Sequence, residues 1–163
     1  MPEILDLLHD SEKRCFAAGE VIIEEGGTSG PLLFLAEGVV EVVMEGVQIA
    51  TTSKPGTVFG VYSLLPGGRD AATIRALQPC VFRVVQDPRT FLKESPLVCW
   101  HVCETIAQRL ATLTAYLCDV QRQFSGDGHL GMMHDVLATL LNREPPDRIR
   151  PSESTLSRGE VGD

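Results

Sequence analysis

Three residues that can bind metals lie close together in the sequence, namely Cys99, His101 and Cys103. Cys99 and Cys103 are one helical turn apart and would share one face of a helix. A tetrahedral metal site, however, needs four ligands that converge on one point. His101 would point elsewhere, and Cys118 lies about four turns further on. We therefore predict no metal site, and expect Cys99 and Cys103 to act as small apolar residues at a helix contact.

No group of residues has the pattern of a catalytic centre. Ser63, next to Tyr62, has no evident histidine partner that would make it a nucleophile. The glycine-rich turns at 27–31 and 66–69 lack the Gly-Lys-Ser/Thr ending of a Walker loop. Glu24 and Glu25 would lie on opposite faces of a strand, so their carboxylates cannot converge. We predict that the protein is not an enzyme.

The size and charge of the chain limit its partners. Its 163 residues fit one domain, and a hydrophobic fraction of 44% is enough for a core. The net charge is −8, and the 14 basic residues are scattered along the chain. Nucleic acid binding needs a concentrated positive face, so we expect no such partner.

The sequence favours a reducing compartment and no membrane. No apolar run approaches the roughly 20 residues of a membrane span. The acidic segment at 1–14 is not typical of a signal peptide. The five cysteines are odd in number and irregularly spaced, unlike those of a disulfide scaffold. We expect a cytoplasmic protein whose thiols are reduced and mostly buried.

Residues 15–86 are typical of a β-structure. Short stretches rich in Val, Ile and Phe alternate with glycine turns about every ten residues; they are VIIEEGG, PLLFLAEG, VVEVVMEG, VQIATTSKPG, ATIRAL and CVFRVVQ. This spacing predicts a β-sandwich or roll of about eight strands, preceded by a short helix over 2–9. Glu41 interrupts an apolar strand, so we expect its side chain to face water. Arg75 is either part of a polar pocket or simply solvated.

Helices follow the Asp87-Pro88 pair. Residues 89–95 can form a short helix, and a long helix is predicted over 96–124, with Pro96 in its first turn and Ser95 as its cap. We therefore expect a main domain at 1–124. A further helix is expected at 129–142, and the proline-rich, charged tail at 143–163 is expected to be disordered.

The long helix carries an apolar stripe with heptad-like spacing. Steps of four and three residues connect Val102, Ile106, Leu110, Leu113, Leu117, Val120 and Phe124. The stripe either packs wholly on the β-roll or packs partly on the same helix of a second chain. A helix of roughly 40 Å is longer than a small roll can cover, so we predict a homodimer.

The stretches FAAGEVIIEEGG, LLFLAEGVVEVV and GTVFGVYSLLPGGRDAATIRALQPCVFRV resemble the cyclic-nucleotide-binding domain of the catabolite-activator and protein-kinase regulatory-subunit superfamily. The resemblance covers about residues 3–124. It implies a mainly β fold with flanking helices: a jelly-roll, or double-stranded β-helix, with a short helix inserted near 61–65 and a long C-terminal dimerisation helix. The resemblance also implies a small cyclic nucleotide, such as cAMP or cGMP, as the ligand.

By this resemblance, the ligand would lie against a phosphate-binding cassette, in which backbone N–H groups at a helix N-terminus hold the phosphate. The corresponding residues here are Phe59, Gly60, Val61, Tyr62, Ser63, Arg69, Asp70, Ala71, Ala72 and Thr73. The family places a Glu directly after Phe-Gly, for the ribose hydroxyl, and an Arg just before the Ala-Thr strand, for the phosphate. This chain has Val61 and Asp70 at these positions, although a local shift of the loop would bring Arg69 to the pocket instead.

Two functions are compatible with these differences. The domain either senses a cyclic nucleotide or a related ligand with weak or altered affinity, or it is a ligand-free scaffold for dimerisation and protein interaction. Direct DNA binding is not expected, because residues 129–142 supply only one helix and the tail is acidic, so no recognition helix is available.

Overall fold

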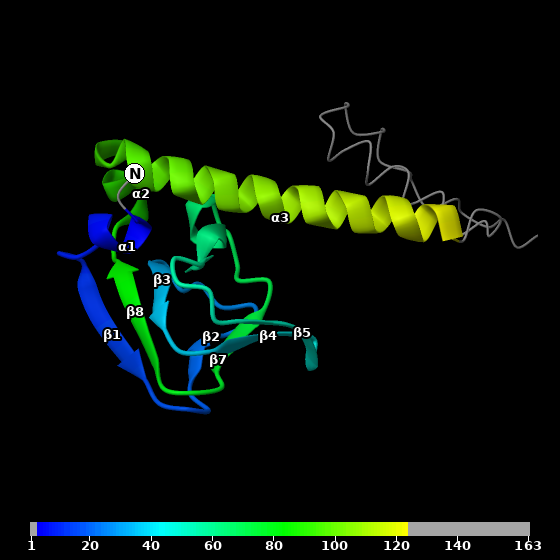
Figure 1. Cartoon of the computed structure of the whole chain (residues 1–163), viewed down its shortest axis with the longest axis horizontal. Coiled ribbons are helices and arrows are strands. Elements are labelled where there is room, and N and C mark those ends of the chain that lie inside the picture. Colours follow the sequence, from blue (N-terminus) through cyan, green and yellow to red (C-terminus); the bar gives the residue numbers. More distant parts are fainter. Residues whose placement is uncertain (1–2, 124–163) are drawn as a thin grey trace, which may run out of the picture. The chain divides into compact units, whose positions relative to one another are not determined.

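Eight short strands and four helical segments make up the part of the chain that the structure, a computed structural model, describes, residues 3–123 (Figure 1). The helix and tail expected at 129–142 and 143–163, as well as Phe124, lie outside the described residues. The strands are β1 (Glu12–Phe16), β2 (Val21–Ile23), β3 (Leu32–Glu37), β4 (Val40–Met44), β5 (Val47–Thr52), β6 (Val58–Phe59), β7 (Thr73–Ala76) and β8 (Cys80–Val85). The helices are α1 (Ile4–Leu7), the 3-10 helix η1 (Val61–Leu64), α2 (Pro88–Glu94) and α3 (Pro96–Gln123).

The strands form two antiparallel sheets, which confirms the predicted β-roll. One sheet has the order β1-β8-β3-β6, and the other has the order β2-β7-β4-β5. Each of the six apolar stretches identified in the sequence contains one strand. β1 and β6 are the additional strands, and both pair within the first sheet.

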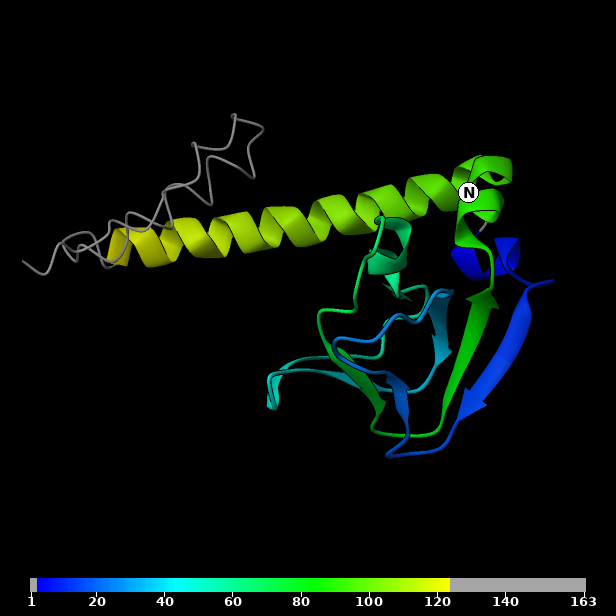
Figure 2. The same cartoon turned by 180° about the vertical axis from the view of Figure 1, so that it is seen from behind.

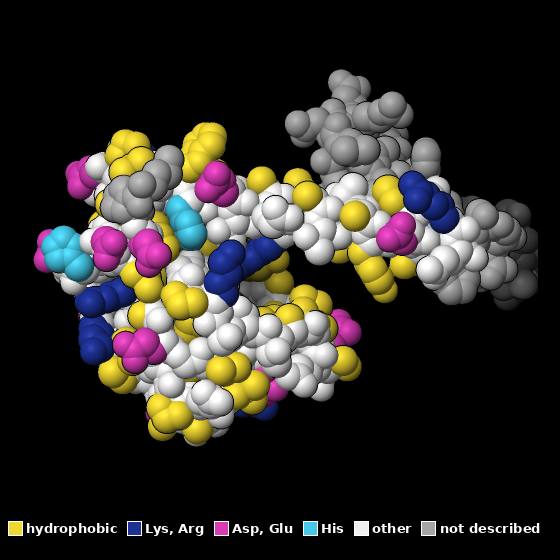
Figure 3. All heavy atoms as spheres, in the orientation of Figure 1, with side chains coloured by type: hydrophobic (Ala, Val, Ile, Leu, Met, Phe, Trp, Pro, Cys, Tyr) yellow, Lys and Arg dark blue, Asp and Glu magenta, His cyan; other side chains and the backbone are white. Residues whose placement is uncertain are grey.

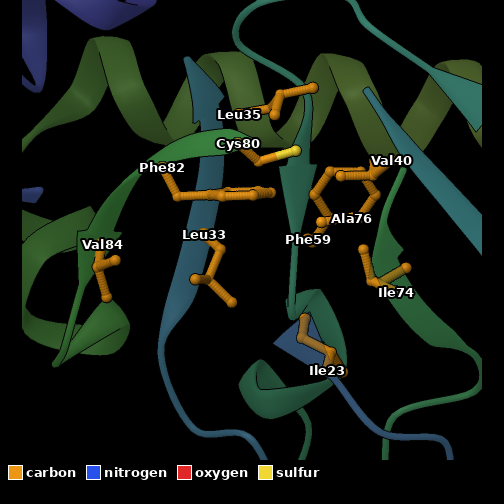
Figure 4. Packing of buried hydrophobic residues seen from close by; sticks show 10 residues of the cluster. All are labelled: Ile23, Leu33, Leu35, Val40, Phe59, Ile74, Ala76, Cys80, Phe82 and Val84. Carbon is orange, nitrogen blue, oxygen red and sulfur yellow. The ribbon is translucent and has the colours of Figure 1, made fainter. Parts of the chain in front are cut away.

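The core between the sheets follows the two-residue period of the strands. In β8, Cys80, Phe82 and Val84 are buried, while Val81 and Arg83 are only partly so. Phe82 lies at the centre, with the ring of Phe16 5.6 Å away in an edge-on arrangement. Figure 4 shows the ten buried residues of this cluster, which are Ile23, Leu33, Leu35, Val40, Phe59, Ile74, Ala76, Cys80, Phe82 and Val84.

A second core fixes the helices to the outer face of the first sheet. β3 has a continuous apolar run, because Leu33 and Leu35 enter the inter-sheet core while Leu32 and Phe34 face the helices. We call this second cluster the helix-side core, and its buried members are Leu8, Leu32, Phe34, Val58, Val85, Val98 and Val102. Figure 2 shows α1, α2 and the start of α3 gathered beside one end of β8. The first turns of α3 are therefore part of the packed domain.

The predicted helices are confirmed over the described residues. The Asp87 side chain accepts a hydrogen bond from Thr90 N at the start of α2. At the start of α3, the backbone oxygen of Ser95 accepts a hydrogen bond from Cys99 N. Contacts divide the chain into two compact units, residues 1–108 and 109–163. Among the described helices, none is both long and apolar enough to cross a bilayer.

Candidate functional site

The segment between β6 and β7 occupies the place of the expected cassette. Gly60 has a left-handed backbone, with φ of 83°, and opens η1. A Cβ atom at this position would lie 2.5 Å from the backbone oxygen of Pro31, so only glycine fits. Ser63 closes the turn, because both its backbone N and its Oγ donate to Gly60 O, at 3.1 and 2.8 Å. The predicted short helix at 61–65 is thus confirmed, and the Ser63 hydroxyl is engaged in holding it.

Asp70 is buried within this segment, with only 6% of its surface exposed. Its Oδ2 accepts a hydrogen bond from the backbone N of Ser29 at 3.1 Å. Its own backbone pairs with the same loop, since Gly26 N donates to Asp70 O at 2.7 Å and Asp70 N donates to Gly27 O at 2.9 Å. The cassette is therefore fastened to the loop between β2 and β3 by three bonds that centre on one residue.

Arg69 contacts the same loop from its exposed side. It is exposed, and its Nη1 donates to the backbone oxygen of Gly26 at 3.2 Å. The sequence left open whether Arg69 or Asp70 would face the pocket. In the structure Asp70 is the buried member of the pair, and the guanidinium of Arg69 lies on the surface of the loop.

The Ser29 hydroxyl stands beside Asp70 without a partner. Its Oγ is buried and makes no hydrogen bond to any of the described residues. It lies 3.6 Å from the position that a Cβ atom on Gly60 would take. A buried hydroxyl without a hydrogen bond is unfavourable for folding.

The other predicted site residues have different surroundings. Phe59 belongs to the inter-sheet core, and Val61 packs against the helix-side core. Thr73 Oγ1 accepts a hydrogen bond from Glu25 N at 3.1 Å. Tyr62 is exposed, while Ala71 and Ala72 are half-buried. The structure thus brings Gly60 and Asp70 to the loop of Ser29, a residue that sequence reasoning did not identify.

Two expectations about charged residues need correction. Glu41 and Arg75 are directly opposite each other on β4 and β7, and Arg75 Nη1 lies 3.1 Å from Glu41 Oε1. The Glu41 side chain is only 13% exposed as a result, and Arg75 is paired rather than simply solvated. Figure 3 shows one face of the domain, on which Lys and Arg side chains are interspersed among acidic and apolar ones.

The expectation of mostly buried thiols is also wrong. All five cysteines are free, but only Cys80 is buried, and Cys15 and Cys103 are exposed. Burial raises the pKa of the Cys80 thiol. Burial, and then the neighbouring Cys103 thiol, raises the pKa of Cys99. Within residues 3–123, no group of three or more His, Cys, Asp or Glu side chains has the arrangement of a metal site.

The predicted stripe on α3 has one member that is not free for a partner. Val102 is 2% exposed and fills the helix-side core of its own chain, together with Val98. Ile106, Leu110 and Leu113 are exposed, whereas Leu117 and Val120 are half-buried. The apolar face of α3 that remains for another chain therefore does not include Val102.

The comparisons with known proteins agree with this fold. Residues 13–93 match the sequence profile of the cyclic nucleotide-binding domain. A segment of 70 residues is 39% identical to the cAMP-dependent protein kinase regulatory subunit of Yarrowia lipolytica. That segment is 43% of this chain and 18% of the length of the yeast protein, so the chain spans less than a fifth of that relative.

Two solved structures are similar over most of the chain. The catabolite activator protein of Thermus thermophilus is 25% identical with a TM-score of 0.59, over 86% of this chain and 76% of that one. A transcriptional regulator from Thermotoga maritima has a TM-score of 0.62 at 15% identity, over 74% of this chain and 99% of that one, which is a likeness of fold alone.

Proposed function

Because this chain belongs to the cyclic nucleotide-binding domain family through residues 13–93, we propose that it is a non-enzymatic regulatory domain that works without a cyclic phosphate in its cassette. The buried carboxylate of Asp70 carries this proposal. It stands where the family resemblance expects an arginine, and it already accepts a hydrogen bond from Ser29 N. The cassette is therefore held in place by the chain itself.

The free energies favour a large loss of affinity for cyclic nucleotides. A hydrogen bond to a charged group contributes about 1.5–3 kcal/mol, and a factor of ten in affinity corresponds to about 1.4 kcal/mol. Asp70 replaces such an attraction by a repulsion, and the side chain of Val61 has no atom that can accept a hydrogen bond from a ribose hydroxyl. Together the differences at Val61 and Asp70 account for a loss of several orders of magnitude in affinity for a cyclic nucleotide.

The output of such a domain is its long helix. Ile106, Leu110 and Leu113 present large apolar side chains to solvent on one face of α3. We propose that this face pairs with the same helix of a second copy, and that the dimer serves as a scaffold for a protein partner. The ion pair of Glu41 with Arg75, the N-cap of α2 and the two hydrophobic cores then stabilise the roll without a ligand.

One observation favours a second candidate function. The Ser29 hydroxyl is buried, has no partner among the described residues and lies next to Gly60. A cyclic nucleotide in an altered pose, or a cyclic dinucleotide, would have hydroxyl and amide groups for this oxygen. In that case the domain is a sensor with weak affinity for its ligand. Ligand binding would shift the equilibrium between different packings of the roll against α3.

Calorimetric titration of the full chain with cAMP, cGMP and cyclic di-GMP separates the two functions. We expect no heat at millimolar ligand for the natural sequence. The double variant Val61→Glu, Asp70→Arg should gain binding of a cyclic mononucleotide, whereas the matched surface variant Asp10→Arg should not. Micromolar binding by the natural sequence would contradict the scaffold and establish the sensor.

Light scattering tests the dimer. Replacing Leu110 and Leu113 together by Glu should give monomers, because two charges would be buried at the helix contact. Ala115→Glu is the control, since Ala115 lies on the opposite face of α3 by helical spacing. A natural chain that is monomeric at micromolar concentration, or a double variant that keeps the dimer mass, would contradict the proposal.

A further inference from the structure

The exposed face of α3 has a more regular repeat once Val102 is removed from it. Steps of four, three, four, three, four and three residues connect Cys99, Cys103, Ile106, Leu110, Leu113, Leu117 and Val120. This is an uninterrupted heptad pattern of a and d positions. Val102 becomes a flanking position, which its own β-roll covers. We call these seven residues the seam of α3, and its first two members, Cys99 and Cys103, carry thiols.

We propose that Cys103 forms a disulfide with Cys103 of a second copy of this chain, so that the seam of α3 is a site of reversible oxidation. The inference rests on the proposed dimer and adds to it a covalent state. Cys103 is exposed in the single chain, as a residue at an open seam must be, and Cys99 beside it is half-buried.

The geometry of a single helix excludes the alternative bond to Cys99. Residues four apart on a helix have Cβ atoms about 5–6 Å from each other, whereas a disulfide needs about 3.5–4.5 Å. Closing a bond between Cys99 and Cys103 would break the first turns of α3, which the helix-side core holds through Val98 and Val102. An oxidised thiol on this face must therefore find its partner on another chain.

Two parallel helices bring the same cysteine of each copy within reach. Packed helices have axes about 8–10 Å apart, and each Cα lies about 2.3 Å from its axis. Residues that point straight at each other across the seam then have Cα atoms about 3.4–5.4 Å apart, and the upper part of this range lies within the disulfide range of about 4.4–6.8 Å. Parallel pairing is expected, because an antiparallel pair centred on Cys103 would extend only over the few residues from Pro96 and leave Ile106 to Val120 without a helix to pair with.

The side chains beside the seam do not oppose parallel pairing. Flanking positions five residues apart meet across such a dimer. Beyond Val102, which the roll covers, the pairs would be Arg109 with Thr114 and Tyr116 with Gln121. Arg109 is the one charged residue among these four positions, so no like charges meet. The second copy of this helix is thus a suitable occupant for the apolar face.

The oxidation balances with a small disulfide, such as oxidised glutathione, as the oxidant. The Cys103 thiolate of one copy attacks a sulfur of the small disulfide, forms a mixed disulfide and releases one small thiolate. The Cys103 thiolate of the other copy then attacks the protein sulfur of the mixed disulfide and releases the second small thiolate. Two electrons pass to the small disulfide. Cys99 is the weaker nucleophile of the pair, since burial and its neighbour raise its pKa.

Oxidation of the full chain with oxidised glutathione at neutral pH tests the inference, with non-reducing electrophoresis and peptide mass spectrometry as the readout. We expect a covalent dimer joined Cys103 to Cys103, which dithiothreitol reverses. Cys103→Ser should lose at least nine-tenths of this dimer. Cys99→Ser should keep it, as should the control Cys118→Ser, which lies on α3 outside the seam.

Light scattering of the reduced protein distinguishes the ways in which this can fail. A non-covalent dimer that gives no Cys103 linkage on oxidation would overturn the thiol site, or show that the helices pair antiparallel, and would leave the proposed dimer intact. A reduced chain that stays monomeric would overturn the proposed dimer and the disulfide with it. A linkage through Cys15 or Cys118 in place of Cys103 would also refute the assignment.

Discussion

Removing the Asp70 carboxylate is the most direct test of how the cassette is held. In Asp70→Ala the bond from Ser29 N to Oδ2, 3.1 Å long, is lost, while the backbone bonds of residue 70 to Gly26 and Gly27 remain. A hydrogen bond to a charged acceptor contributes about 1.5–3 kcal/mol, and the abandoned N–H adds to the loss if it stays buried. We therefore expect the free energy of unfolding to fall by about 2 kcal/mol.

Urea unfolding, followed by circular dichroism and by the fluorescence of Trp100, measures this change. With a slope of about 2 kcal/mol per molar, the midpoint should fall by about 1 M. The matched control is Asp10→Ala, whose carboxylate is 91% exposed beside His9. Exposed ion pairs contribute about 0–1 kcal/mol, so this midpoint should move little.

Ser29→Ala distinguishes the contribution of the Asp70 carboxylate to stability from that of the Ser29 side chain. This variant keeps the backbone N–H that bonds to Asp70 and removes only the unpartnered Oγ. Its stability should be unchanged or slightly higher, because a buried hydroxyl without a partner is unfavourable. Equal losses in Ser29→Ala and Asp70→Ala, or no loss in Asp70→Ala, would refute the reasoning.

Three further predictions concern single positions in the roll. Gly60→Ala should destabilise by about 1–3 kcal/mol more than Gly46→Ala, because both have positive φ but only Gly60 would bring a Cβ within 2.5 Å of a backbone oxygen; equal urea midpoints would contradict this. Cys80 should resist iodoacetamide in the folded protein, as judged by mass spectrometry, since burial raises its pKa; rapid labelling would be the contrary result. The Gln86 amide, by hydrogen bonding, lowers the pKa of Glu12 below its ordinary 4.5, so this carboxylate stabilises the fold above that pH and the stabilisation is lost as pH falls through the lowered value. Glu12→Gln should flatten the acid side of the melting-temperature profile, and an unaltered profile would argue against it.

Strands with apolar side chains could be predicted, while strands that depend on pairing could not. The six apolar stretches between glycine turns each contain an observed strand. β1 has the sequence Glu-Lys-Arg-Cys-Phe, in which only Phe16 packs against the core. Its five-residue register against β8 is a tertiary interaction that no local pattern reports. β6 has only two residues, too few for a period to be visible.

The orientation of the site depends on contacts between distant segments. The resemblance correctly predicted the short inserted helix, but Arg69 and Asp70 are neighbours, and either could have faced inward. The choice is made by the loop at Gly26 to Ser29, about 40 residues away, whose amides bind Asp70 and whose carbonyl binds Arg69. Ser29 was missed for the same reason, because an isolated serine in a glycine-rich loop has no pattern that predicts its role.

The helix was predicted to carry an apolar stripe, and in the structure Val102 at the start of that stripe packs on the roll, while Ile106, Leu110 and Leu113 are exposed. Val98 and Val102 face the roll, while Ile106 continues a seam that begins at the two cysteines. Periodicity identifies which residues share a face, but only the packed roll shows which edge of that face is already covered. The correction at Val102 is what moves the seam by one position and brings Cys103 into it.

The proposed ligand-free cassette and the proposed disulfide at Cys103 are connected through the first turns of α3. If Asp70 holds the cassette without a ligand, a signal must enter the domain elsewhere, and a bond at Cys103 would act on the residue next to Val102. Val102 is packed in the helix-side core, and the neighbouring His101 Nε2 lies 2.8 Å from the backbone oxygen of Gly56 at the entry to β6. Oxidation can change the conformation of the roll only if the contacts of Val102 and His101 differ between the disulfide-linked and the unlinked dimer. The hydrogen-exchange rates of the β6 amides in the oxidised and reduced dimers would therefore differ if the seam regulates the roll, and would be identical if it only links two copies.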